Sequence, residues 1–430
     1  MKNTRLFGRL HRSRCSHTGG AARFCTIRCL LVSVLLCSLL TAVYASAPDT
    51  IAPDEELPVI SVGTVSQEFP GTISASSAIL VDEEGSVLWA FNADTRMPMA
   101  STTKIMTALT VLSAGMDLDA SVTIPPEAVG VEGSSIYLYE GESLTAGQLL
   151  DAVLMESAND AAAALAIAHA GSLDAFASKM NACAASLGLT DTHFMNPHGL
   201  SHREHYTTAR ELSVIARAAM EYPAFRASVS CYKKEIPLCG SEGVRLLINH
   251  NKLLKNLEGC IGIKTGYTKD AGRCLVSACT RDGITLYCVT LDAPDDWNDH
   301  TALYEWGFSQ VERVVLTEAG EQYAVLPVVG AALAGGGAVQ SGSVVSTAVK
   351  NTDAHAVILL RSHGEIRREL RCPRFLYAPV SAGDVVGCVV YTDADTGTVY
   401  AEVPLYACEN VPAYQKPGLW QRIKSLFKIK

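Results

Sequence analysis

Residues 98–112 have the sequence PMASTTKIMTALTVL. Small and polar residues lead into Ile105 and Leu109, which begin an apolar series at helical spacing, and this pattern predicts a helix that starts at Ser101. Lys104 then lies one turn further along the same face, where Cβ atoms are roughly 5–6 Å apart. An extended lysine side chain can therefore bring its amine to the Ser101 hydroxyl.

This pair of residue types suits nucleophilic catalysis. A serine hydroxyl is a poor nucleophile until a base accepts its proton. A lysine amine can act as that base only if its pKa falls from the free value of about 10.4, through burial or a cationic neighbour. A helix N-terminus at Ser101 would add partial positive charge beside the developing negative charge. The same Ser-x-x-Lys spacing also occurs in capped surface helices, so other motifs must decide between the two interpretations.

Two later motifs favour catalysis. Ser157-Ala158-Asn159 offers a second hydroxyl and a side-chain amide, and Lys264-Thr265-Gly266 stands at the end of an alternating strand pattern. Each is common alone, the first as turn chemistry and the second as a solvated strand end. In this order, with Ser101 and Lys104, they form the Ser-x-x-Lys, Ser-x-Asn and Lys-Thr-Gly set of penicillin-interacting serine enzymes.

The residues around these motifs narrow the family. The segments 97–108, 157–162, 194–200 (FMNPHGL) and 263–268 (IKTGYT) resemble the D-alanyl-D-alanine carboxypeptidases, the low-molecular-mass penicillin-binding proteins that trim peptidoglycan stem peptides. The resemblance covers roughly residues 70–310 and, more weakly, the rest of the chain. It implies removal of the terminal D-alanine from stem pentapeptides through an acyl-enzyme, and acylation of the same serine by β-lactams.

The motifs and the resemblance together imply two-step acyl transfer. Ser101 is expected to be the nucleophile that forms the acyl-ester, and Lys104 its proton acceptor. Ser157 would relay a proton to the leaving amine, because its hydroxyl can hydrogen-bond between Lys104 and Lys264. Asn159 carries both a donor and an acceptor, and it would orient Lys104 and the substrate amide.

Substrate binding is assigned to the strand motif. Lys264 supplies positive charge that would lower the pKa of the base and attract the terminal carboxylate. Thr265 would hydrogen-bond that carboxylate, and Gly266 leaves room for substrate along the strand edge. By resemblance, the oxyanion hole uses the backbone N–H groups of Ser101 and Tyr267.

One departure from the family concerns the carboxylate. In related enzymes, an arginine that precedes a Trp-Gly-Phe motif often helps to bind the terminal carboxylate of the substrate. The motif here is Trp306-Gly307-Phe308. Residues 291–297 have the sequence LDAPDDW, without an arginine. The carboxylate contact is therefore in doubt or left to Lys264 and Thr265.

Metal and cofactor chemistry are not expected. No CxxC pair occurs among the 14 cysteines, and His202 and His205 have no third ligand at useful spacing. His198, in an Asn-Pro-His-Gly turn, is expected to support the site.

Export would permit disulfides, but their connectivity cannot be determined from the sequence. Several cysteines in apolar strand patterns are expected to be small buried hydrophobes; they are Cys274, Cys279 and Cys288.

The N-terminus has the pattern of a secretory signal. Residues 1–28 carry seven basic residues and no acid, and residues 29–44 form an apolar run that ends at Ala45-Ser46-Ala47. We therefore predict a signal peptide over 1–47, followed by a linker over 48–70. Because Pro48 directly follows the predicted cleavage site, an uncleaved membrane anchor and cleavage after Ala45 are alternatives.

The net charge of the chain is −9, and without the seven basic residues of the N-terminal segment it is −16. This negative charge argues against nucleic acid as a partner.

The remaining patterns predict an α+β catalytic domain over 71–310. A hairpin at 77–91 and strands at 259–265, 273–280 and 284–291 suggest an antiparallel sheet with helices, including 146–155 and 160–169, segregated to one face. The resemblance implies the same β-lactamase/transpeptidase-like arrangement. Residues 311–412, which are rich in Val and Gly, predict a small all-β domain that acts as a spacer.

The tail over 413–430 predicts an amphipathic helix on a membrane surface. Its large apolar residues share one arc of a helical wheel, opposite two lysines; they are Leu419, Trp420, Ile423, Leu426 and Phe427. A helix docked on its own protein is the alternative. Family members are similarly held at the outer face of the cytoplasmic membrane, so an exported, peripheral protein is expected.

Three rival functions remain. A class A β-lactamase would show Ser-Asp-Asn and a deacylating glutamate on a separate loop, whereas this chain has Ser157-Ala158-Asn159. A D,D-endopeptidase cleaves the same type of bond and is harder to exclude. A non-catalytic cell-wall or β-lactam-binding protein would not need intact Ser101, Lys104 and Lys264.

Overall fold

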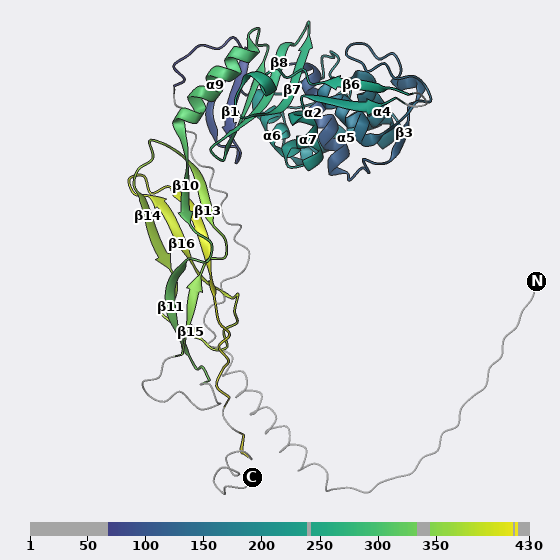
Figure 1. Cartoon of the computed structure of the whole chain (residues 1–430). Helices are drawn as coiled ribbons and strands as arrows, with labels where there is room; N and C mark the ends of the chain where they lie inside the picture. Colours follow the sequence, from purple (N-terminus) through teal and green to yellow (C-terminus); the bar gives the residue numbers. More distant parts are fainter. Residues whose placement is uncertain (1–67, 239–241, 333–344, 416–417, 420–430) are drawn as a thin grey trace, which may run out of the picture. The chain divides into compact units, whose positions relative to one another are not determined.

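A five-stranded antiparallel sheet forms the centre of the N-terminal part of the protein. The computed structural model describes residues 68–238, 242–332, 345–415 and 418–419 (Figure 1). The strand order is β2-β1-β9-β8-β7, and every neighbouring pair is antiparallel. The strands span Ser77–Asp82 (β1), Val87–Phe91 (β2), Cys260–Thr268 (β7), Gly272–Arg281 (β8) and Ile284–Leu291 (β9).

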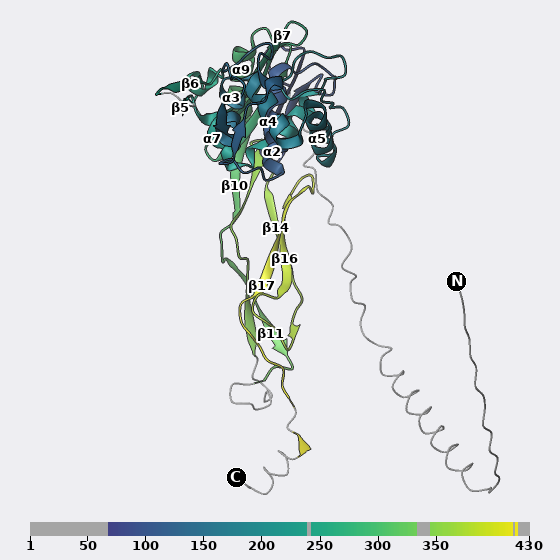
Figure 2. The same cartoon turned by 90° about the vertical axis from the view of Figure 1, so that its right-hand side faces the viewer.

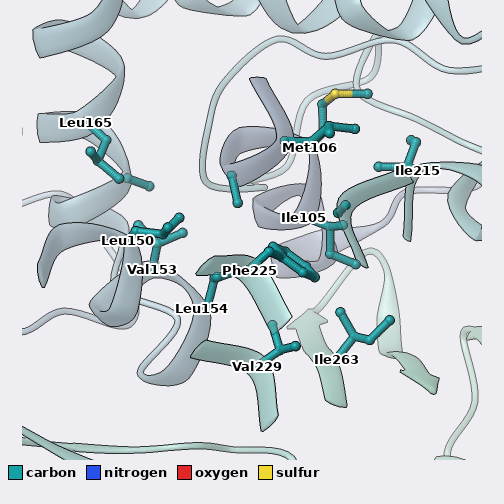
Figure 3. Packing of buried hydrophobic residues seen from close by; sticks show 14 of the residues in the cluster. Ile105, Met106, Leu150, Val153, Leu154, Leu165, Ile215, Phe225, Val229 and Ile263 are labelled. Carbon is teal, nitrogen blue, oxygen red and sulfur yellow. The ribbon is translucent and has the colours of Figure 1, made fainter. Parts of the chain in front are cut away.

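Most of the helices lie on one side of this sheet, some of them against the sheet and others packed on those helices. They are the 3₁₀ helix η1 (Ala100–Thr103), α2 (Lys104–Ser113), α3 (Ala146–Met155), α4 (Asn159–Ala170), α5 (Leu173–Ser186), α6 (Ala209–Met220) and α7 (Pro223–Ser230). Helix α4 is alanine-rich and buried over most of its length, as expected of a helix that is apolar all round. Their apolar side chains and those of one sheet face form the main core, part of which is shown in Figure 3.

The opposite face of the sheet is covered by α9 (Asp296–Gln310). Leu303 and Tyr304 of this helix pack on Leu80 and Leu286 of the sheet. A Cβ atom on Gly307 would lie 2.6 Å from Leu80, so the glycine allows the helix to approach closely. The α+β fold with an antiparallel sheet is therefore confirmed, but the prediction that the helices lie on one face was wrong.

Smaller elements and buried cysteines complete this part. Cys274, Cys279 and Cys288 are buried in the sheet, as predicted. Two small two-stranded sheets and two short helices lie in the loops; they are β3 (Ser121–Thr123) with β4 (Ser143–Thr145), β5 (Lys233–Pro237) with β6 (Val244–Ile248), η2 (Pro126–Ala128) and α8 (Leu253–Asn256).

The C-terminal part is a separate all-β domain (Figure 2). A six-stranded sheet has the order β14-β16-β17-β12-β11-β15, and β10 pairs with β13. The strands span Val311–Thr317 (β10), Gln322–Val329 (β11), Ser346–Lys350 (β12), His355–Leu360 (β13), Ile366–Arg371 (β14), Leu376–Tyr377 (β15), Val385–Asp393 (β16) and Val399–Ala407 (β17).

Within the described ranges, no single helix has the length and apolar composition to cross a membrane; only the bent pair α4 and α5 meets that test together. The predicted signal peptide and most of the predicted linker and amphipathic tail lie outside the described residues.

Candidate active site

Ser101 and Lys104 meet at the start of α2. Ser101 lies in η1, and side chains three residues apart nearly eclipse one another in a 3₁₀ turn. Lys104 is 0% exposed, and its Nζ lies 3.0 Å from Ser101 Oγ. The same amine lies 2.6 Å from Asn159 Oδ1 and 2.7 Å from the backbone oxygen of His198. The predicted helix therefore begins as a 3₁₀ turn, which aligns the Ser101 hydroxyl with the Lys104 amine.

The surroundings of Lys104 disfavour its charged form. Burial lowers its pKa well below the ordinary value, and the positive charge of Lys264 lowers it further, against a smaller opposing effect of Asp160. Lys264 is itself buried, and burial lowers its pKa to about 7 while Glu156 acts in the other direction. A neutral Lys104 amine is what a serine nucleophile needs as its base.

The Ser157 and Asn159 motif is held at the N-terminus of α4. Ser157 has a φ of 60°, in the left-handed region that non-glycine residues enter mainly at constrained or functional sites. Asn159 accepts a bond from Lys104 and donates through Nδ2 to the backbone oxygen of Glu132. No hydrogen bond joins the Ser157 hydroxyl to either lysine in the described part of the chain, so the predicted relay stays a prediction.

Asp160 fixes the loop that faces this motif. Its carboxylate accepts hydrogen bonds from the Ser135 hydroxyl at 2.6 Å and from the backbone N–H groups of Ile136 and Leu138. The adjoining loop residue Ser134 accepts a bond from the backbone N–H of Asn159 at 2.7 Å. The Ser157 turn and the facing loop are thus tied together.

The Lys-Thr-Gly motif lies inside β7, which continues to Thr268; the prediction that it ends the strand was wrong. Lys264 Nζ donates to the backbone oxygen of Thr265 at 3.0 Å. A Cβ atom on Gly266 would lie 3.1 Å from the backbone nitrogen of Ser101, so glycine lets η1 pack directly on the strand. This contact brings the three motifs to one place.

A cavity of about 330 Å³ opens between these elements. Of the predicted site residues, five line it, namely Ser101, Ser157, Thr265, Gly266 and Tyr267, whereas Lys104, Asn159 and Lys264 are not among its lining residues. The remaining lining residues were not predicted from the sequence; they are Ser134, His250, Lys252, Arg273, Asp296 and Trp297.

Two buried histidines, His198 and His205, lie close to the Ser101–Lys104 segment. His205 lies 2.7 Å through Nε2 from the Thr103 hydroxyl, which donates to the backbone oxygen of Ala100, and its Nδ1 accepts from the backbone N–H of Met195. Burial lowers the pKa of His205 to about 4 and that of His198 to about 3, so both rings are neutral near pH 7. Among the described residues no group of three or more His, Cys, Asp or Glu side chains could hold a metal ion.

Comparison with known proteins identifies the family. Residues 62–295 match the peptidase S11 family, described as D-alanyl-D-alanine carboxypeptidase. The chain belongs to this family. It is a serine-type hydrolase of the D-alanyl-D-alanine carboxypeptidase class, related to the penicillin-binding proteins.

Individual relatives extend this similarity beyond the matched segment. The chain is 29% identical over 349 residues to the D-alanyl-D-alanine carboxypeptidase DacF of Bacillus subtilis, covering 78% of this chain and 86% of that protein. It is 33% identical over 283 residues to a D-alanyl-D-alanine endopeptidase of Pseudomonas aeruginosa, covering 64% and 86% respectively. The crystal structure of penicillin-binding protein 5 from Haemophilus influenzae matches with a TM-score of 0.62 and 25% identity, over 80% of this chain and all of that one.

A change at Lys264 tests the electrostatic coupling in the site. Lys264→Gln removes a cation that lowers the pKa of Lys104, so that pKa rises and the base becomes protonated at a higher pH. We expect the acid limb of the rate of acylation by a fluorescent penicillin, followed against pH, to move to higher pH. Lys255→Gln, which removes an exposed lysine that does not line the cavity, should leave the limb in place. An unmoved limb in Lys264→Gln would contradict the coupling.

Proposed function

We propose that Ser101 is the nucleophile of a D-Ala-D-Ala carboxypeptidase that acts on peptidoglycan stem pentapeptides. The observation that carries this assignment is the 3.0 Å separation between Ser101 Oγ and the buried amine of Lys104. The amine accepts the hydroxyl proton as the oxygen attacks the carbonyl between the last two D-alanines. The backbone N–H groups of Ser101 and Tyr267 stabilise the negative charge that develops on the carbonyl oxygen.

Collapse of the tetrahedral intermediate breaks the C–N bond. The proton taken up by Lys104 passes through the Ser157 hydroxyl to the leaving amine, and free D-alanine departs. A water molecule then gives its proton to Lys104 and attacks the ester carbonyl, which frees the shortened peptide as Ser101 recovers its proton. Ser157 lines the same cavity as Ser101, which supports its assignment as the relay.

In this proposal the substrate is bound by four residues, namely Asn159, Lys264, Thr265 and Gly266. Asn159 orients the Lys104 amine through their 2.6 Å contact. Substrate lies along β7, whose edge is free of another strand in this sheet. Penicillins acylate Ser101 because their strained amide occupies the position of the scissile bond.

The cellular setting is proposed from the sequence alone. We infer that residues 1–47 direct export, that 48–70 link to a peptidase domain over 71–310, and that 311–412 form a β domain that acts as a spacer. The segment 413–430 would hold the enzyme at the outer face of the cytoplasmic membrane, where its cell-wall substrate is made. Nucleic acid is not a partner, and the chemistry requires no metal or cofactor.

Replacement of the nucleophile tests the assignment of Ser101. Ser101→Ala is expected to release no D-alanine from a pentapeptide ending in D-Ala-D-Ala, and to give no penicillin adduct by mass spectrometry. The control is Ser113→Ala, at the other end of α2, which should keep both activities because Ser113 lies far along the helix from the cavity. A penicillin adduct in Ser101→Ala would overturn the assignment.

The wild-type products distinguish the rival functions. Activity confined to cross-linked dimers would favour the endopeptidase, the activity named for the Pseudomonas relative. Rapid penicillin turnover would favour a β-lactamase, and no product from any substrate would favour a binding protein.

Deletion of residues 418–430 tests the membrane proposal. The truncated chain keeps the cavity residues but loses the apolar arc and its lysines, so it should move from the membrane to the soluble exported fraction. Fractionation and immunoblotting of cells that express either form would measure this. Unchanged membrane association of the truncated form would refute the anchoring role of the tail.

A further inference from the structure

Arg273 stands in the wall of the catalytic cavity, on the strand next to the Lys-Thr-Gly motif. In the β7–β8 register Arg273 is opposite Tyr267, and Thr265 is opposite Leu275. Side chains on one face of an antiparallel pair interact along such diagonals, where long side chains can reach each other. Thr265 and Arg273 are therefore diagonal neighbours on the same face, and both line the cavity with Ser101.

We propose that Arg273 binds the terminal carboxylate of the substrate, together with Thr265. The inference rests on the proposed function and assigns the residue that makes the site specific for a free C-terminus. A carboxypeptidase has to distinguish a free carboxylate from a continuing peptide. A guanidinium group recognises a carboxylate through paired, charge-assisted hydrogen bonds.

The guanidinium is held in place before substrate arrives. Its Nε and Nη2 both donate to Asp296 Oδ1, at 3.1 Å and 2.6 Å, and its carbon lies 5.5 Å from the centre of the Trp297 ring. Asp296 is 2% exposed, whereas the Arg273 side chain is 40% exposed. Nη1 makes no hydrogen bond to any described residue, so its N–H groups can bind a ligand in the cavity.

The residues that hold the Arg273 guanidinium belong to the segment 291–297, which contains no arginine of its own. Residues 291–297 contribute Asp296 and Trp297, and the backbone N–H of Ala293 donates to the backbone oxygen of Arg273 at 2.8 Å. The loop before α9 thus positions a cation that comes from the neighbouring strand. Because Arg273 and Asp296 together are neutral, recognition depends on short, directed hydrogen bonds more than on long-range attraction.

The other basic residues in or beside the cavity, Lys264, His250 and Lys252, fit this role less well. Lys264 is buried and its amine already donates to the backbone oxygen of Thr265. His250 pairs with Glu156 at 3.3 Å, and burial lowers its pKa, so it is mostly uncharged near pH 7. Lys252 is exposed and has no acidic partner among the described ion pairs, so it would lose more conformational freedom on binding.

A pair of peptides tests the assignment. One is diacetyl-L-Lys-D-Ala-D-Ala and the other is its C-terminal carboxamide, and kcat/KM is measured for both on the same enzyme preparation. Wild type should prefer the free acid, and Arg273→Gln should lose activity on the free acid on the order of 10- to 100-fold, the range of a charge-assisted hydrogen bond. Activity on the carboxamide should change little, so the preference collapses.

The ratio of the two values is the readout, because any loss of folded enzyme affects both peptides equally. The double variant Arg273→Gln/Asp296→Asn avoids an unpaired buried carboxylate and should show the same collapse. The control is Arg281→Gln, which removes an arginine from the same strand that pairs with Glu305 of the same helix at 2.7 Å and lies over the Phe308 ring. Its preference should equal that of wild type.

Retention of the free-acid preference in Arg273→Gln and in the double variant would overturn the role of Arg273. An equal loss on both peptides would also overturn it, since that result indicates a structural role. Failure of the proposed function gives a different result, namely no release of D-alanine or D-alaninamide by wild type.

Discussion

The contact between the Lys104 amine and the Ser101 hydroxyl is the interaction on which the rest of the site depends. A lysine in water would be protonated at neutral pH and could accept nothing from the serine. Here the amine is removed from solvent, faces a second buried lysine and is oriented by Asn159 and the His198 carbonyl. Burial thus lowers the pKa of Lys104 and favours the neutral amine, which can accept a proton.

The fold can be understood as the framework that keeps this amine buried and aligned. The 3₁₀ turn of η1 brings residues 101 and 104 into register before α2 continues into the core. Gly266 allows β7 to approach η1, and Gly199, at φ 89°, allows the His198 turn to approach Ala100. A side chain at either glycine would push apart the elements that enclose Lys104. The close packing of the motifs therefore keeps the Lys104 amine buried beside the Ser101 hydroxyl.

Much of this arrangement could be predicted from the sequence, because its determinants are local. The helix that follows Ser101, the turn at Ser157 and the strand at Lys264 each have a short pattern of their own. Other features depend on which elements meet in space. The His198 carbonyl leaves no side-chain signal, and α9 on the second sheet face follows from Gly307 fitting against Leu80. Arg273 could not be found by searching residues 291–297, because the strand register brings it to the cavity and Asp296 holds it there.

The most direct test of this account is the pKa of Lys104 in the folded enzyme. Lysine side-chain amines labelled with ¹⁵N can be followed by NMR against pH, and the Lys104 signal can be assigned by its loss in Lys104→Arg. The account predicts that this amine titrates well below the ordinary lysine value of about 10.4. Titration of Lys104 near that ordinary value in the intact enzyme would contradict it, because the base would then be charged at the pH at which it has to accept the serine proton.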